Sequence, residues 1–385
     1  MIPYSKQFIS QKDIKAVTNV LKSKYLTQGE QVPLFESKIK NYVGSKHALA
    51  VSSASAALHL SCIALGLKKN DILWTVPNTF VSSASCGLHC GANVSFVDID
   101  EKSNNISIEK LEEKLKIAKK QKKLPKILVP VHFAGRPTPQ EKIYKLSKIY
   151  GFKILEDASH SLGSRYKKNK VGNCKWSDIT VFSFHPVKPI TTGEGGMITT
   201  NSKKYRDILV KLRTHGITKD IKQLKKKIKS KWYYEQQLLG FNYRMSDIQA
   251  ALGVSQLKNI NNFLNYRNKI AKRYLQKLKD LPIILPEVDK TIYSSYHLFV
   301  IRFRLETIKK NYDRLFNQIL SKGIGINLHY LPVHLQPIFK NMGFKDGDYP
   351  ISENYSKSAI SIPIYYKMSK LEQDKVIRVL QEVLR

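Results

Sequence analysis

Two stretches of the sequence carry most of the information about its fold: KILEDASHSLG at residues 153–163 and ITVFSFHPVK at residues 179–188. Each begins as an apolar strand pattern and ends in side chains that can take part in chemistry, Asp157 and His160 in the first and Lys188 in the second. In open α/β sheets, ligands bind outside the carboxyl ends of the strands. We therefore predict that these three side chains belong to one site.

The residues before and between these stretches alternate short apolar runs with helical patterns. Strands are predicted at residues 48–52, 71–76, 93–99 and 126–132, and helices at residues 54–67, 81–90, 108–120 and 140–150. This βαβ rhythm predicts an α/β fold with a mostly parallel sheet that helices cover on both faces.

The second part of the chain has a different pattern. After a strand at residues 197–200, a long helical region is predicted for residues 245–278, and Pro282 and Pro286 break the pattern. A mixture of further elements follows, with strands at residues 297–303 and 325–328 and helices at residues 308–322 and 370–384. We predict an N-terminal arm and large domain at residues 1–255 and a small α+β C-terminal domain at residues 256–385.

The charge is strongly basic, with 65 Lys and Arg against 30 Asp and Glu and a net charge of +35. The basic residues are densest at residues 116–126 and 222–231, where they alternate with aliphatic residues as on an exposed helix face. They are not interleaved with aromatic residues that could stack on bases. This favours a solvated, lysine-rich surface that attracts anionic substrates over a nucleic-acid or membrane surface. With no signal peptide or membrane-spanning run, we expect a cytoplasmic protein.

The chain has four cysteines, too few for a disulfide scaffold in 385 residues. Cys86, His89 and Cys90 are close enough in sequence to suggest a metal site. They fall within a predicted buried helix, however, and no second ligand pair has matching spacing. The sequence therefore favours thiols in packing positions, and we expect no metal.

Small and polar residues follow two of the predicted strands. The run SSASA at residues 52–56 opens a helix, so its backbone N–H groups and the helix dipole could hold a phosphate. A serine N-cap explains the same run equally well. Ser183 ends another strand and could donate a hydrogen bond to the same phosphate.

Three other side chains complete a set that suits a planar, phosphate-bearing cofactor. Asp157 could cap the next helix, or it could keep a pyridinium nitrogen protonated and so make the ring an electron sink. Lys188 could be a surface lysine, or a desolvated amine for Schiff-base chemistry. Phe80 could belong to the core, or it could stack on the ring.

Longer motifs carry a family resemblance over nearly the whole chain. They are LTQG at residues 26–29, EDASHSLG at 156–163, SFHPVK at 183–188 with TTGEGG at 191–196, and GFNYRMSDIQ at 240–249. With them, the sequence resembles the sugar aminotransferases of the DegT/DnrJ/EryC1/StrS family, which have the aspartate-aminotransferase fold (fold type I of the pyridoxal-phosphate enzymes). The resemblance implies pyridoxal 5′-phosphate as the cofactor.

The same resemblance implies a role for each matching residue. Lys188 would be the Schiff-base lysine, Asp157 would face the pyridine nitrogen, and His160 would lie near the ring. Phe80 would stack on the ring, and the phosphate would be held by Ala54, Ser55 and Ser183; the family often has threonine at the position of Ser55, and the hydroxyl is retained. Asn242 and Arg244 would reach into the partner subunit's site, which implies a homodimer with shared active sites.

Within the family, the chain is most similar to enzymes that aminate a UDP-linked 4-keto-sugar, UDP-2-acetamido-2,6-dideoxy-β-L-arabino-hexos-4-ulose, with L-glutamate as donor. The similarity depends on IPYS at residues 2–5, SKYLT at 23–27, TTGE at 191–194 and HYLP at 329–332. The substrate contacts that it implies are Tyr4, Lys24, Tyr25, Leu26, Thr27, Ala54, Ser183, Asn242, His329, Tyr330, Leu331 and Pro332. Those in the terminal segments could equally belong to an arm, a helix end and a strand end.

Three alternatives remain at this point. Some members of the family are dehydratases with histidine in place of the lysine, and Lys188 argues against that chemistry. Another nucleotide-linked keto-sugar, such as a 3-keto or a dTDP-linked one, could be the acceptor. A basic nucleic-acid-binding protein, or a regulator that only binds the cofactor, would leave the set formed by Asp157 and Lys188 without an explanation.

Overall fold

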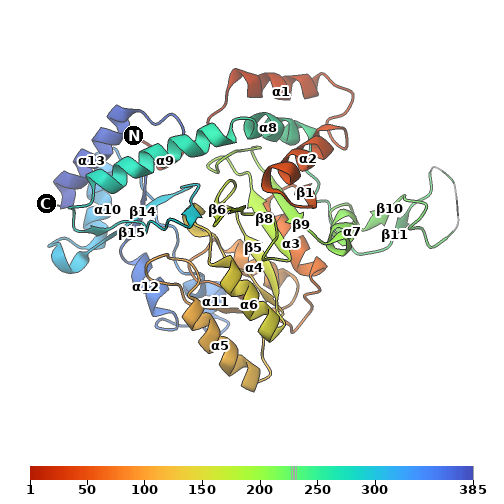
Figure 1. Ribbon diagram of the computed structural model, residues 1–385, viewed down its shortest axis with the longest axis horizontal. Helices are drawn as coiled ribbons and strands as arrows, with labels where there is room; N and C mark the ends of the chain where they lie inside the picture. The colour runs from red at the N-terminus through yellow and green to blue at the C-terminus, as the bar shows by residue number, and fades with distance from the viewer. Residues whose placement is uncertain (227, 229, 231, 385) are drawn as a thin grey trace.

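The computed structural model describes residues 1–226, 228, 230 and 232–384 (Figure 1). A seven-stranded sheet lies at its centre. Its order is β1 (His47–Val51), β9 (Gly196–Thr200), β8 (Ile179–Ser183), β5 (Lys153–Asp157), β4 (Ile127–Leu128), β2 (Ile72–Thr75) and β3 (Asn93–Phe96). The strands from β8 to β3 are parallel, whereas β9 is antiparallel to both of its neighbours. The predicted α/β fold with a mostly parallel sheet is confirmed.

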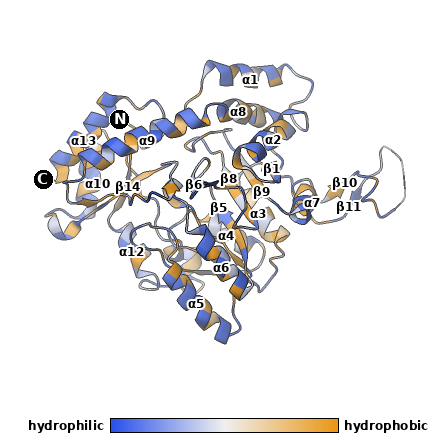
Figure 2. Cartoon of the chain, viewed as in Figure 1, coloured by the Kyte–Doolittle hydropathy of each residue, from blue (hydrophilic) through white to orange (hydrophobic). Residues whose placement is uncertain are grey.

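The strands are apolar on both faces because helices cover both. Along β8, Val181 packs into one core and Phe182 into the opposite one, as the two-residue side-chain period of a strand requires. One face is covered by α3 (Ala54–Ala64), α4 (Ser82–His89) and α7 (Lys203–Leu212). The other is covered by α2 (Gln31–Val43), α5 (Ile108–Lys120), α6 (Gln140–Tyr150) and α8 (Asp247–Leu257). Figure 2 shows the matching apolar and polar sides of α5 and α6.

Several of these helices begin at a serine whose hydroxyl accepts a hydrogen bond from a backbone N–H of the first turn. Ser53 does so for α3, and Ser246 does so for α8 in a capping box with Gln249. A capped start fixes where each helix meets the sheet. For α3 this point is the carboxyl-end edge of the sheet, beside β9.

The C-terminal part has its own core around a three-stranded sheet of β12 (Ile283–Ile284), β14 (Phe299–Phe303) and β15 (Ala359–Ile362). Three helices pack on it: α9 (Ile260–Lys277), α10 (Tyr312–Ser321) and α13 (Lys370–Leu384). The N-terminal arm reaches this core, since Ile2 is buried in it and its N–H donates to Gly323 over 2.9 Å. The two-domain division near residue 255 stays a prediction.

Some elements differ from the sequence prediction. Residues 245–278 form two helices, α8 and α9, separated at Lys258 and Asn259. Residues 126–132 give only the two-residue strand β4, because Pro130 has no N–H for the ladder. Residues 325–328 form no strand; Asn327 makes a single bridge to Ser361.

The helix face expected at residues 222–231 is not found either. Lys227, Lys229 and Lys231 lie outside the described residues, and for the other residues of this segment the prediction is wrong. The described residues form turns, in which carboxylates bind backbone N–H groups that a helix would need. Asp220 accepts from Lys222, and Glu235 accepts from Lys225 and Lys226. These turns cap a hairpin of β10 (Ile217–Thr218) and β11 (Glu235–Gln236), which the sequence did not predict and which projects from the body (Figure 1).

Two smaller features complete the description. A small sheet of β13 (Ile292–Tyr293), β6 (Arg165–Tyr166) and β7 (Asn169–Lys170) was not predicted either. The helix α1 (Gln11–Leu21) packs along α8 at the upper edge of Figure 1. In the described part of the chain, no helix has the length and apolar character needed to span a membrane.

Candidate active site

A cavity of about 630 Å³ lies at the carboxyl ends of β5 and β8. Its wall brings together predicted residues from six separate segments: Tyr4, Ala54, Ser55, Phe80, Asp157, His160, Ser183, Lys188, His329 and Tyr330. A second, larger hollow of about 1130 Å³ lies between α1 and α8. We assign the chemistry to the smaller cavity because it holds the buried carboxylate, lysine and imidazoles.

Asp157 is held by two hydrogen bonds at the end of β5. The Ser83 hydroxyl donates to one carboxylate oxygen over 2.6 Å, and the Ser159 backbone N–H donates to the other over 3.0 Å. The side chain is only 5% exposed. Both bonds fix the direction of the carboxylate, as a partner for a buried cation requires.

Lys188 follows β8 across a short loop in which its backbone N–H donates to the carbonyl of His185 over 2.9 Å. Burial lowers the pKa of its amine to about 8, while the Asp157 carboxylate raises it. A neutral amine is the nucleophilic form of lysine. The cavity wall therefore carries an amine that is easily deprotonated.

His160 lies against a second, unpredicted imidazole. Its Nδ1 accepts from the Ala134 backbone N–H over 3.2 Å, so Nε2 carries the proton and donates to the Tyr330 hydroxyl at 3.2 Å. The His297 ring lies beside it, tilted by 47°, with 4.3 Å between ring centroids. Burial holds the pKa of both imidazoles well below the ordinary range, and the nearby Lys188 adds to the effect.

The N-terminus of α3 faces the cavity and has the features of an anion site. Ser55 lies in its first turn, and its hydroxyl hydrogen bonds with that of Ser82 at 2.7 Å. Gly196 of β9 lies directly behind this turn: a Cβ there would be 2.4 Å from the Ser53 carbonyl oxygen and 2.8 Å from the Ala54 nitrogen. Only glycine lets β9 approach the turn so closely.

Replacing Gly196 by alanine is expected to displace this turn. The clash should lower the free energy of unfolding by about 1–3 kcal/mol, as overpacking does, and weaken the affinity for a phosphate-bearing ligand. Denaturant unfolding and a ligand titration measure the two effects. Gly151→Ala is the control, because Gly151 has open space around it and lies outside the cavity wall; its positive φ of 79° means that the substitution should cost stability but leave ligand affinity unchanged. Equal affinities for both variants would contradict the assigned role of Gly196.

The structure does not bring every predicted residue to the cavity. Lys24 and Tyr25 line the larger hollow, whereas the exposed Leu26 and Thr27 line neither. The remaining four also lie outside the cavity wall: Asn242, Arg244, Leu331 and Pro332. Within one chain, therefore, eight of the predicted substrate and partner-site residues lie outside the cavity wall, whereas the other predicted substrate residues line it.

Other residues of the wall were missed from the sequence. The cavity is also lined by His297, Asn327 and Glu194. Ser83 lies outside the wall and donates a hydrogen bond to Asp157. His297 is 2% exposed, and its Nδ1 has no hydrogen-bond partner among the described residues. A histidine just before an apolar strand was the available signal, but nothing in the pattern connects it to residue 160.

Comparison with known proteins identifies the class. Over 388 residues, 100% of this chain and 98% of the relative, the chain is 37% identical to the UDP-4-amino-4,6-dideoxy-N-acetyl-β-L-altrosamine transaminase of Campylobacter jejuni. It is 35% identical over 387 residues to the spore coat polysaccharide biosynthesis protein SpsC of Bacillus subtilis, covering 100% of this chain and 97% of SpsC.

Solved structures agree with these relatives. PseC of Helicobacter pylori, an aminotransferase involved in the biosynthesis of pseudaminic acid, superposes with a TM-score of 0.90 at 30% identity, covering 100% of this chain and 99% of PseC. The protein is thus a pyridoxal-phosphate-dependent sugar aminotransferase. It belongs to the DegT/DnrJ/EryC1/StrS aminotransferase family, which it matches over residues 7–381. The resemblance seen in the sequence is confirmed.

The donor set of the cavity fits this cofactor. A buried carboxylate, an amine of lowered pKa and a helix N-terminus with serine hydroxyls suit, respectively, the ring nitrogen, the aldehyde and the phosphate of pyridoxal 5′-phosphate. The tight packing of Gly196 against the first turn of α3 fixes the position of the backbone that would bind the phosphate. The cofactor supplies an electron sink for the carbon that loses and gains the proton.

Proposed function

We propose that this enzyme moves the amino group of L-glutamate to the C4 keto group of UDP-2-acetamido-2,6-dideoxy-β-L-arabino-hexos-4-ulose. The product would be UDP-4-amino-4,6-dideoxy-N-acetyl-β-L-altrosamine, in a cytoplasmic pathway to pseudaminic acid. The observation that carries the proposal is 37% identity over the whole chain to the C. jejuni transaminase named for that product. The full-length match to PseC supports it.

In this proposal, Lys188 and Asp157 are the catalytic residues at the cofactor. Lys188 would hold the cofactor through its amine, and the same amine would serve as base and then as acid for the proton that the substrate carbon loses and gains. Asp157 would face the ring nitrogen and favour its protonated form, and its two hydrogen bonds support this role by fixing the direction of the carboxylate. Ala54, Ser55 and Ser183 would hold the phosphate, and Phe80, an exposed side chain of the cavity wall, would stack on the ring.

The sugar half of the cavity is assigned to aromatic and imidazole side chains. Tyr330 is held by its hydrogen bond to His160, and the His329 ring lies 5.3 Å from Tyr4 between centroids. Burial lowers the pKa of His329 to about 4, so this imidazole is neutral and can accept a hydrogen bond from a sugar hydroxyl. We assign the contacts with the keto-sugar to these residues.

A homodimer is part of the proposal, with Asn242 and Arg244 serving the partner subunit's site. Asn242 is exposed and lies outside this chain's own cavity, which supports the assignment. We expect Lys188→Ala and Asn242→Ala to be inactive alone and to regain about a quarter of the wild-type activity after unfolding and refolding together, because half of the random dimers would carry one intact site. A mixture that stays inactive, although hybrid dimers are recovered by tag affinity, would contradict the shared site.

The acceptor is tested by a panel of nucleotide-linked keto-sugars with L-glutamate as donor. The proposed UDP-linked 4-keto-sugar should give the highest kcat/KM, with dTDP-linked 4-keto and 3-keto sugars below it. A higher value for another sugar would overturn the proposed substrate while leaving the enzyme class intact. No conversion of the bound cofactor by L-glutamate would overturn the donor instead.

The lowered pKa of Lys188 predicts a pH dependence for cofactor capture. Only the neutral amine attacks an aldehyde, so the rate of covalent uptake of pyridoxal phosphate by the apoprotein should rise with pH. It should level off near the Lys188 pKa of about 8 instead of climbing toward the ordinary lysine value of about 10.4. Stopped-flow absorbance measures the rate, and a continued climb to about pH 10 would contradict the lowered pKa.

A further inference from the structure

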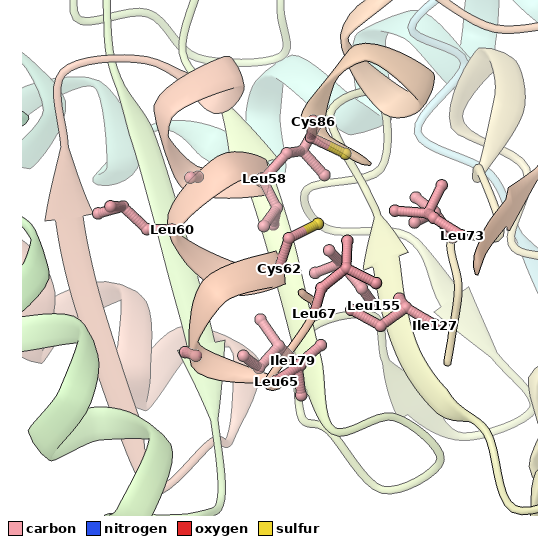
Figure 3. Close-up of a cluster of buried hydrophobic side chains, with 14 of the residues drawn as sticks. Leu58, Leu60, Cys62, Leu65, Leu67, Leu73, Cys86, Ile127, Leu155 and Ile179 are labelled. Carbon is pink, nitrogen blue, oxygen red and sulfur yellow. The ribbon is translucent and has the colours of Figure 1, made fainter. Parts of the chain in front are cut away.

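The helices on the two faces of the central sheet are held by different kinds of contact. Figure 3 shows the core around α3, where the thiols of Cys62 and Cys86 lie among apolar side chains. On the opposite face, α2 and α8 also share an apolar core, but a buried carboxylate joins them as well. It belongs to Asp247, the first residue of α8, which is only 1% exposed. Asp247 lies outside the cavity wall, so the chemistry assigned there gives it no role.

The side chain of Asp247 binds backbone groups at the start of α2 and just before it. One carboxylate oxygen accepts from the N–H groups of Gln31 and Val32 over 2.8 and 3.0 Å, and the other accepts from that of Gly29 over 2.5 Å. The backbone N–H of Asp247 donates to the Leu26 carbonyl over 2.9 Å. The N-cap residue of α2 makes no side-chain hydrogen bond to the first turn. Asp247 therefore caps α2 from a different helix.

These bonds hold residues 24–29, a segment with little other support. Every side chain from residue 24 to residue 28 is exposed. Among the described residues, each hydrogen bond that joins this segment to a distant part of the chain goes to Asp247. Gln28 has a φ of 58°, a conformation that persists in a residue other than glycine only where the surroundings impose it. The position of the segment therefore depends on Asp247.

The first turn of α8 also contacts the cavity wall. Gln249, two residues after Asp247, donates from its side-chain amide to the carbonyl of Glu194, a residue of the wall, over 2.8 Å. The residues assigned to the partner subunit's site, Asn242 and Arg244, come just before the same turn. The start of α8 thus connects the cavity, the segment at residues 24–29 and the residues proposed to serve the partner.

This connection matters more for a large substrate than for a small one. A nucleotide-linked sugar carries a diphosphate and a nucleoside beyond its keto carbon, so it extends past the groups around Lys188. L-Glutamate is small and has no such extension. Residues 24–27 are assigned to the sugar substrate, and among them the exposed Lys24 offers an ammonium group that suits a diphosphate. The place of that ammonium group relative to the cavity is set by Asp247.

We propose that Asp247 is a positioning residue for the acceptor half of the reaction. It fixes residues 24–29 against the start of α8, so that their side chains meet the nucleotide part of the sugar substrate. The inference rests on the proposed function, in which residues 24–27 contact that substrate. Asp247 acts through the segment and not on the substrate, and it has no part in the donor half, in which L-glutamate delivers its amino group.

Asp247→Asn in the holoenzyme tests the proposal. The change replaces one acceptor oxygen with an NH₂ group that faces a backbone N–H, so one side of the connection is lost. We expect kcat/KM for the keto-sugar to fall by about 10–100-fold, as for a misplaced binding group, through a higher KM. The rate at which L-glutamate converts the bound cofactor, followed by absorbance, should stay within a few-fold of the wild type. Hydrogen exchange in a peptide covering residues 23–34 should become faster.

Gly29→Ala is a second variant, which keeps the carboxylate. A Cβ at Gly29 would lie 3.0 Å from a carboxylate oxygen of Asp247 and 3.0 Å from the Cβ of Tyr25, so it should push the segment away and raise the same KM. The acceptor in these assays is whichever nucleotide-linked keto-sugar the wild type uses best. A failure of the proposed function would therefore show in the wild type, whereas a failure of this proposal shows only in the variants.

Asp13→Asn is the matched control. Asp13 is also 1% exposed and lies in the first turn of a helix, but its carboxylate binds Ser10 and Gln256 and not the segment at residues 24–29. The substitution should leave both halves of the reaction and the hydrogen exchange of the segment unchanged. A wild-type KM for the keto-sugar in both Asp247→Asn and Gly29→Ala, or an equal loss in the donor and acceptor halves, would overturn the proposal.

Discussion

Lys188→Ala is expected to bind pyridoxal phosphate without linking it covalently and to lose turnover with L-glutamate by about 10⁴-fold or more. The variant removes both the amine that holds the cofactor and the group that moves the proton, and acid–base catalysis alone is worth about 10²–10⁴-fold. An absorbance spectrum of the protein with pyridoxal phosphate, before and after L-glutamate, makes the measurement. The wild type should show the visible band of the lysine-linked cofactor and lose it on adding glutamate.

Two further variants separate chemistry from charge. Lys203→Ala removes an exposed lysine on α7 that pairs with Asp207 at the surface, and it should behave like the wild type. Lys188→Arg keeps a positive charge in the wall but has no nucleophilic amine, so it should fail like Lys188→Ala. Near-normal turnover in either Lys188 variant would remove this residue from the mechanism.

The part of the site near Lys188 could be predicted because sequence order and sheet geometry agree there. Asp157 and Ser183 each end a buried strand, and parallel neighbours β5 and β8 place their carboxyl ends side by side. The run at residues 52–56 follows β1 and opens α3, so it reaches the same edge. The carboxyl ends of the predicted strands are therefore sufficient to locate the cofactor half of the cavity.

The sugar half could not be found in the same way. His297 comes just before β14 in the C-terminal part, and its segment is joined to that of His160 by Ser295, whose hydroxyl donates to the His160 carbonyl over 2.7 Å. Its own sequence neighbourhood carries no sign of that contact. Tyr4 and His329 were proposed from family motifs, and no strand or helix period would have selected them.

Hydrogen bonds between carboxylates and backbone N–H groups also limited what could be predicted for residues 222–231. The lysines at residues 222–231 alternate with aliphatic residues as on a helix, yet in the described residues of that segment the backbone N–H groups bond to Asp220 and Glu235. Such side-chain contacts depend on a carboxylate ten residues along the chain from Lys225. A periodicity argument considers only the residues inside its own window and cannot detect them.

Asp157→Asn is expected to lower kcat by about 10²–10³-fold, the usual cost of losing one fixed electrostatic group. The amide keeps the size of the side chain, and its oxygen can still accept the bond from Ser83 or from the Ser159 N–H. What disappears is the negative charge, so the ring nitrogen would lose its proton more easily and the electron sink would weaken. Steady-state kinetics with the cofactor saturating measures the effect.

Glu156→Gln is the matched control, because Glu156 is the neighbouring buried carboxylate and points away from the cavity. It accepts hydrogen bonds from Gln140, Thr180 and Ser177. Its loss should lower the free energy of unfolding by about 1–3 kcal/mol, the cost of disturbing a buried hydrogen-bonded group, and leave kcat of the folded enzyme within a few-fold. If both variants lose the same activity, Asp157 acts through stability alone. If only Asp157→Asn loses activity while its unfolding is unchanged, the charge at the end of β5 is what the reaction requires.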